Sequence, residues 1–89
     1  MKKTKTFTLK NQLGLHARVA AMMVKVSNKY QSKISLEKDG TEVDGKSILD
    51  ILTLACPQGS SIIVTAEGKD AIDAIEEFDR LIEDKFGED

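Results

Sequence analysis

The pattern of apolar and polar positions predicts four short strands. Apolar and polar residues alternate in two segments, residues 3–9 and residues 32–38. This period of two is typical of a strand with one buried face. In the second of them, Ile34 and Leu36 point inward. Asp39-Gly40 is a strong two-residue hairpin signal and predicts a return strand directly after it. The predicted strands cover residues 3–9, 32–38, 41–44 and 60–67, the last of them rich in β-branched residues.

Three helices are predicted from apolar residues that recur at the i, i+3, i+4 and i+7 spacing. The first covers about residues 17–28, and we expect Lys25, Ser27 and Lys29 to point away from the core. Its apolar stripe consists of Val19, Met22, Met23, Val26 and Tyr30.

The second helix is expected to begin at Ser47 and to run for about two turns. Ser47 and Asp50 have the spacing of a capping box. The stripe of this helix would be Ile48, Ile51, Leu52 and Ala55, with Leu49 outside it.

The third helix is expected over about residues 71–85, with Asp70 as its N-cap and Gly87 at its end. Residues 88 and 89 are expected to fray. Its stripe would be Ala71, Ile75, Phe78 and Ile82, supported by Ile72 and Leu81.

This β-α-β-β-α-β-α order, without repeats or linkers, predicts a single domain over residues 1–89. Amphipathic helices and half-buried strands together favour an α+β two-layer sandwich with the helices on one face of the sheet. The hairpin makes at least part of the sheet antiparallel.

Composition excludes several classes of function. Fifteen acidic and thirteen basic residues give no electrostatic footprint for nucleic acid. The one cysteine, Cys56, rules out an internal disulfide and is expected to be a small buried hydrophobe, and no Cys/His cluster suggests a metal site. No apolar run approaches the roughly 20 residues of a membrane span. We expect a cytoplasmic protein without a cofactor.

The strongest candidate for chemistry is Gly14-Leu15-His16-Ala17-Arg18, which contains the only histidine. A lone histidine is more often structural or merely exposed. Here, however, His16 lies at the predicted start of a helix, where free backbone N–H groups and the helix dipole favour an anion. Arg18 adds a fork of donors for phosphate oxygens, and a neutral imidazole can attack a phosphoryl group. His16 is therefore a candidate phosphate acceptor.

Two further features allow alternative interpretations. Ser47 is usually just an N-cap in such a position, but it is also a candidate for regulatory phosphorylation, which Asp50 would oppose by like-charge repulsion. The second helix has more apolar residues than one stripe requires. Either they add to the core or they form an exposed patch for a partner.

The sequence resembles a known family, the histidine-containing phosphocarrier proteins (HPr) of the bacterial sugar phosphotransferase system. The stretch 14–18 followed by Ala20-Ala21 is similar to the family's active-site signature. Gly45-Lys46-Ser47-Ile48-Leu49 is similar to its regulatory-serine segment. The resemblance covers essentially the whole chain.

The resemblance implies an open-faced β-sandwich, with a four-stranded antiparallel sheet covered on one face by three helices. It implies that His16 accepts a phosphoryl group on Nδ1 from phospho-enzyme I and passes it to enzyme IIA domains, with Arg18 contacting the phosphate. Ser47 would be the target of HPr kinase/phosphorylase where that enzyme exists, and a transcriptional regulator is a further possible partner. The implied protein is a monomeric carrier rather than a stand-alone enzyme. The implied partner surface consists of Ala17, Ala21, Ile48, Leu49 and Leu52.

Two positions depart from the family pattern. Val19 stands where the family usually has proline, so it should permit the helix while leaving its first turn freer. Asp50 stands where a small or basic residue is more common.

Two other functions remain as alternatives. One is a regulatory binding module of the same fold that is controlled at Ser47. The other is a small nucleic-acid-binding domain, which the net charge and the few aromatic residues disfavour.

Overall fold

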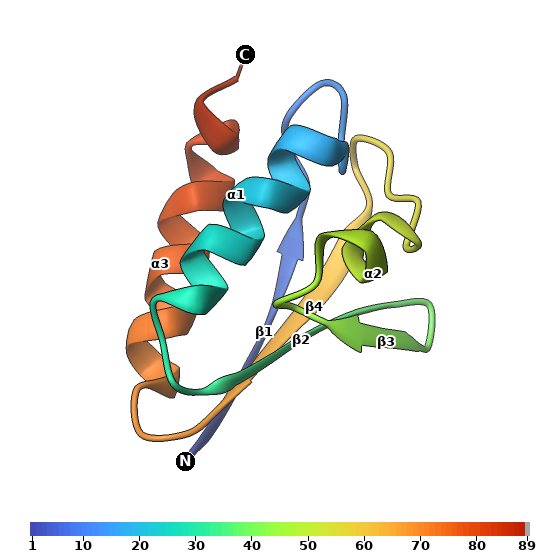
Figure 1. Ribbon diagram of the computed structural model, residues 1–89. Helices are drawn as coiled ribbons and strands as arrows, with labels where there is room; N and C mark the ends of the chain where they lie inside the picture. Colours follow the sequence, from blue (N-terminus) through green and yellow to red (C-terminus); the bar gives the residue numbers. More distant parts are fainter. Residues whose placement is uncertain (89) are drawn as a thin grey trace.

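The computed structural model describes residues 1–88 and has an antiparallel sheet of four strands, covered on one face by three helices (Figure 1). This confirms the predicted α+β open-faced sandwich and the β-α-β-β-α-β-α order. The elements are β1 (Lys2–Thr8), α1 (Ala17–Asn28), β2 (Lys33–Lys38), β3 (Thr41–Asp44), α2 (Ile48–Leu52), β4 (Ser61–Glu67), α3 (Ala71–Glu83) and the 3₁₀ turn η1 (Lys85–Gly87).

The sheet has the strand order β1-β4-β2-β3, so that β4 and β2 are central and β1 and β3 form the edges. Leu36 shows the register, because it pairs with Val64 of β4 and with Val43 of the hairpin strand β3. Strands with one covered face alternate between buried and accessible side chains. The burial pattern of β2 follows this rule, as its alternation predicted, and so does that of β4. The edge strand β1, for which alternation was also predicted, buries only Phe7.

The core lies between the sheet and the helices. Val19, Met23 and Val26 of α1 are buried there, as the predicted stripe requires. The buried side chains of α3 are Ala71, Ala74, Ile75, Phe78 and Ile82.

Two predicted orientations are wrong. Ser27 is fully buried instead of pointing away, because α1 also packs against α3 and its buried face is wider than a single stripe. Ile72 is 44% exposed, because the buried face of α3 is already filled by the residues at the i, i+3, i+4 and i+7 positions from Ala71. Leu81 packs against the core, as predicted.

The prediction for α2 is also wrong in length and orientation. The helix ends at Leu52, and Ala55 lies beyond it, exposed and in a left-handed conformation with φ of 51°. Ile51 is buried and Leu49 is exposed, as predicted, whereas Ile48 is exposed and Leu54 reaches the core in place of Ala55.

The last helix ends at Glu83 rather than near residue 85. No helix within residues 1–88 is long and apolar enough to cross a membrane.

Candidate functional site

His16 occupies the N-cap position of α1, with extended backbone angles (φ −115°, ψ 179°). Its ring makes no capping hydrogen bond, so it stays available for other contacts. The first intrahelical bond runs from the Ala20 N–H to the His16 carbonyl oxygen (2.9 Å). The amides of residues 17–19 therefore have no partner within the helix, and the positive end of the dipole lies beside the imidazole. This geometry favours an anion next to the ring, as the sequence predicted.

The loop before His16 is fastened to the segment that follows α2. The Leu15 N–H donates to the Cys56 carbonyl oxygen at 2.7 Å. Gly14 has φ of 68°, and a Cβ there would overlap that carbonyl and lie 2.7 Å from the Pro57 carbonyl carbon. Only glycine fits both the backbone angle and the close approach. Gly14 therefore fixes the position of the residues that lead into the histidine.

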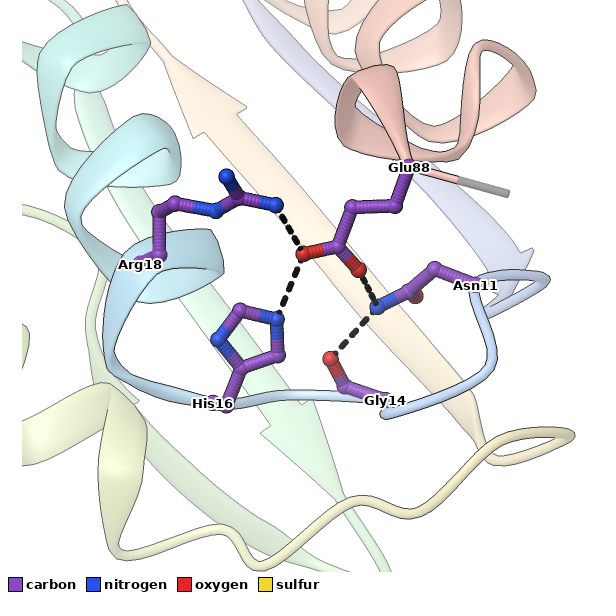
Figure 2. A network of polar contacts seen from close by, with 5 residues as sticks. All are labelled: Asn11, Gly14, His16, Arg18 and Glu88. Carbon is purple, nitrogen blue, oxygen red and sulfur yellow. Dashed lines mark hydrogen bonds and ion pairs between the residues drawn. The ribbon is translucent and has the colours of Figure 1, made fainter.

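An acidic side chain from the far end of the sequence completes the site (Figure 2). The Glu88 Oε2 atom lies 2.8 Å from His16 Nε2 and 2.6 Å from Arg18 Nη2. The Glu88 Oε1 atom accepts a 3.0 Å hydrogen bond from Asn11 Nδ2, which also donates to the Gly14 carbonyl oxygen at 2.7 Å. Arg18 and His16 are thus brought together by a shared carboxylate oxygen.

The expectation that residues 88 and 89 fray is wrong for Glu88, whereas Asp89 lies outside the described residues. The physical reason is the turn that follows α3. Phe86 is only 2% exposed and anchors this turn in the core. Lys85, Phe86 and Gly87 all have positive φ and direct the chain back towards the start of α1.

The charges in the site are exposed to different degrees. The Glu88 side chain is 12% exposed, His16 is 29% exposed and Arg18 is 68% exposed. The hydrogen bond from Arg18, followed by that from Asn11, lowers the pKa of Glu88 to about 2. The carboxylate is therefore ionised at neutral pH and serves only as an acceptor.

Ser47 caps a different helix, α2. Its Oγ accepts a hydrogen bond from the Asp50 N–H at 3.2 Å, which confirms the predicted cap. The Ser47 N–H itself donates to the Asp44 carbonyl oxygen. Ser47 is half-buried, and the helix that it caps has only five residues.

Exposed apolar side chains are present at the start of α2. Leu49 is 77% exposed and Ile48 is 39% exposed, whereas Leu52 is half-buried. Ala17 and Ala21 of α1 are also exposed. The apolar excess is therefore divided: Leu54 adds to the core, whereas Ile48 and Leu49 are exposed, and binding of a partner there stays a prediction. Leu13, 71% exposed in the loop before His16, is a further apolar side chain that the sequence analysis did not single out.

Asn11 and Glu88 are the site residues that sequence reasoning missed.

Within residues 1–88, no group of three or more His, Cys, Asp or Glu side chains is arranged to hold a metal ion. The site therefore consists of an imidazole, a guanidinium, a carboxylate and the N-terminus of a helix.

Comparison with known proteins identifies the family. The family model described as "PTS HPr component phosphorylation site" matches residues 3–84. The chain belongs to the HPr family. It is similar to the phosphocarrier protein HPr of Xylella fastidiosa (strain Temecula1), with 42% identity and 92% of each chain covered. It is 40% identical to the HPr-like protein Crh of Halalkalibacterium halodurans, over 89% of this chain and 94% of that protein. A crystal structure of HPr from Thermoanaerobacter tengcongensis superposes with a TM-score of 0.94 and 45% identity, and 98% of each chain is covered.

The chain is a phosphocarrier component of the phosphotransferase system. Val19, at the position where the resemblance implies proline, is the third residue of α1 and is fully buried. The helix begins at Ala17 all the same, as expected for a valine in the first turn.

Proposed function

We propose that His16 accepts a phosphoryl group on Nδ1 from phospho-enzyme I and transfers it to enzyme IIA. The observation that carries this proposal is the placement of the His16 ring. It stands at the N-cap of α1 beside unpaired amides, with Nε2 already bound to Glu88. The Nδ1 lone pair attacks the phosphorus atom as the bond to the donor breaks. The same steps run in reverse towards the acceptor.

Arg18 would stabilise the phosphoryl group through its remaining donors. A guanidinium has five N–H groups, and in the described structure Nη2 donates to Glu88. Its 68% exposure leaves the group accessible to a phosphate that arrives from solvent or from a partner protein. A charge-assisted hydrogen bond from Arg18 would strengthen as negative charge gathers on the transferred oxygens.

The exposed apolar residues would form the surface on which enzyme I and enzyme IIA dock. Leu49 is the residue most suited to anchor a partner, because a large apolar side chain gains most when it is removed from water. This proposed surface consists of Ala17, Ala21, Ile48, Leu49 and Leu52. The protein would act as a monomer on it.

Ser47 would be a regulatory site for HPr kinase/phosphorylase where a host has that enzyme. Its Oγ accepts only one weak cap bond, so phosphorylation would sacrifice little local structure. A phosphate there would lie beside the exposed Leu49 and close to Asp50, which would oppose it. Modification at Ser47 would therefore change the charge of the docking surface.

The test is labelling with enzyme I and phosphoenolpyruvate that carries ³²P. The proposal predicts one acid-labile phosphate per chain, which chases onto enzyme IIA. The His16→Ala variant should take up no label, whereas Ser47→Ala should be labelled like the wild type. Label that survives His16→Ala would contradict the proposal.

A second candidate is a regulatory module that is controlled at Ser47 and binds a transcriptional regulator. The observation in its favour is that Ser47 stands directly before the exposed pair Ile48 and Leu49. ATP-dependent, acid-stable phosphate on Ser47 without any transfer to enzyme IIA would favour this role. The shared network of His16 and Arg18 supports the carrier function instead.

A further inference from the structure

We propose that Glu88 is a positioning residue for phosphoryl transfer: its carboxylate holds the His16 ring with Nε2 protonated and so leaves the lone pair on Nδ1. This inference rests on the proposed function, in which His16 is the acceptor. It assigns a role to a residue that contacts neither the attacking nitrogen nor the incoming phosphorus.

The contact with His16 determines where the ring proton is. An ionised carboxylate can only accept hydrogen bonds, so His16 Nε2, at 2.8 Å from Glu88 Oε2, must be the donor. In a neutral imidazole the other nitrogen then has the lone pair. Figure 2 shows Nδ1 on the side of the ring that points away from Glu88. The carboxylate therefore selects the nucleophile without obstructing it.

The same arrangement suits the product of the reaction. Nδ1 forms the P–N bond with its lone pair and has no proton to release, while the bond between phosphorus and the donor breaks. The ring keeps its Nε2–H and gains positive charge. Glu88 offsets that charge at hydrogen-bond distance, as a buried carboxylate does beside a catalytic histidine in other sites.

Glu88 is itself held firmly. Arg18 donates to Oε2 at 2.6 Å and Asn11 donates to Oε1 at 3.0 Å, so both carboxylate oxygens are engaged. Asn11 is fully buried and also binds the Gly14 carbonyl oxygen, which connects the carboxylate to the loop before His16. Arg18 and Asn11 together keep the pKa of Glu88 near 2, so the acceptor persists across the physiological pH range.

The backbone that carries Glu88 is strained. Lys85 and Phe86 have φ of 54° and 56°, a conformation that residues other than glycine rarely adopt. The buried ring of Phe86 and the hydrogen bond from the Glu88 N–H to the Lys85 carbonyl oxygen (2.8 Å) hold this turn. Strained backbone persists where its surroundings impose it, and it gathers at functional sites. Here the strained turn places Glu88 over the start of α1.

The first measurement is nitrogen NMR of the His16 ring, at a pH where the imidazole is neutral. The wild type should show a protonated Nε2 and an unprotonated Nδ1. In Glu88→Ala, a larger share of the Nδ1–H tautomer should appear and the Nε2 proton should exchange faster with water. The matched control is Glu83→Gln, which removes an exposed carboxylate that pairs with Lys10 rather than with His16, Arg18 or Asn11. A wild-type ring that is mainly protonated on Nδ1, or a ring unchanged by Glu88→Ala, would overturn the inference.

The second measurement is single-turnover transfer from phospho-enzyme I. Glu88→Ala should slow the transfer step about tenfold while the KM for this protein as substrate of enzyme I changes less than twofold, because orientation is lost and docking is kept. Glu88→Gln should be intermediate, since its carbonyl oxygen can still accept from Nε2 although its amide opposes that of Asn11. Glu83→Gln should match the wild type. An equal or faster rate in Glu88→Ala would contradict the positioning role.

The two measurements separate the inference from the function on which it rests. If wild-type protein takes no phosphate from enzyme I, the proposed function fails, and the NMR spectra still decide whether Glu88 sets the ring tautomer. If the wild type is labelled on His16 and Glu88→Ala is labelled equally fast, the function stands and the positioning role is wrong.

Discussion

At the scale of single residues, hydrogen bonds with a few neighbours shift the pKa of individual side chains. Tyr30 shows this most simply, because its hydroxyl donates to Glu77 Oε1 at 2.5 Å. That bond, with smaller effects from burial and from the Glu77 charge, raises the pKa of Tyr30 to about 12. The chain has one tyrosine and no tryptophan, so the absorbance of tyrosinate reports on this group alone.

An alkaline titration tests this contact. We expect the tyrosinate absorbance of the folded protein to rise with a midpoint near pH 12. Glu77→Gln should move the midpoint towards the ordinary value near 10, because the negative charge that holds the proton is gone. Glu76→Gln, at an exposed neighbouring position, is the control and should titrate like the wild type. A wild-type midpoint near 10 in folded protein would contradict the hydrogen bond.

At the scale of elements, the loop before α1 depends on its glycine in two ways. Gly14→Ala meets both an unfavourable positive φ and an overlap with the Cys56–Pro57 backbone. Gly40 also has a positive φ, 84°, which is unfavourable for alanine, but a Cβ there would meet no other atom within 4 Å. The two glycines therefore separate the cost of the dihedral angle from the cost of the overlap.

Urea unfolding of the two alanine variants measures this difference. Gly40→Ala should lower the free energy of unfolding by about 1 kcal/mol, the ordinary cost of a left-handed alanine. Gly14→Ala should cost at least about 2 kcal/mol, because backbone atoms must also move. Equal losses in the two variants would show that the loop accommodates a Cβ without strain.

The elements themselves were largely predictable from the sequence. Alternation located β1 and β2, β-branched residues located β4, and the 3.6-residue stripe located α1 and α3, because these signals are local and repeat several times. The signal for α2 was too short to be reliable. A stripe is barely defined over five residues, and Leu54 is buried where Ala55 was predicted to be.

At the scale of the whole molecule, α3 and the turn after it are tied to α1 and its flanking loops by three carboxylates. Asp70 accepts from the backbone N–H groups of residues 31 and 32 and from the Ser32 hydroxyl. Glu77 accepts from Lys29 and Tyr30. Glu88 accepts from residues on both sides of the start of α1. Hydrogen bonds lower the pKa of all three groups.

These contacts predict how stability depends on acid. A carboxyl group whose pKa is lower in the folded state adds stability above its unfolded pKa and loses it as the pH falls through its folded pKa. For Glu88 that interval runs from about 4.5 down to about 2. The free energy of unfolding of the wild type should therefore exceed that of Glu88→Gln by a constant amount above pH 5, and the difference should vanish as the pH approaches 2. A difference that does not depend on pH would contradict the ionised contact.

The candidate site was only partly predictable, because some of its residues are far apart in the sequence. His16, Arg18 and the helix start are neighbours in sequence, so a motif could reveal them. Glu88 lies 72 residues from His16. Nothing in the last residues distinguishes this glutamate from the other acids near it. Only the burial of Phe86 and the turn that it fixes bring Glu88 to the ring.

The central claim is that His16 takes phosphate on Nδ1. Phosphorus NMR of nitrogen-15-labelled protein, after incubation with enzyme I and phosphoenolpyruvate, tests it most directly. The account predicts a single phosphoryl resonance coupled to the nitrogen atom Nδ1 of His16. Coupling to Nε2, or phosphate on any other residue, would contradict it.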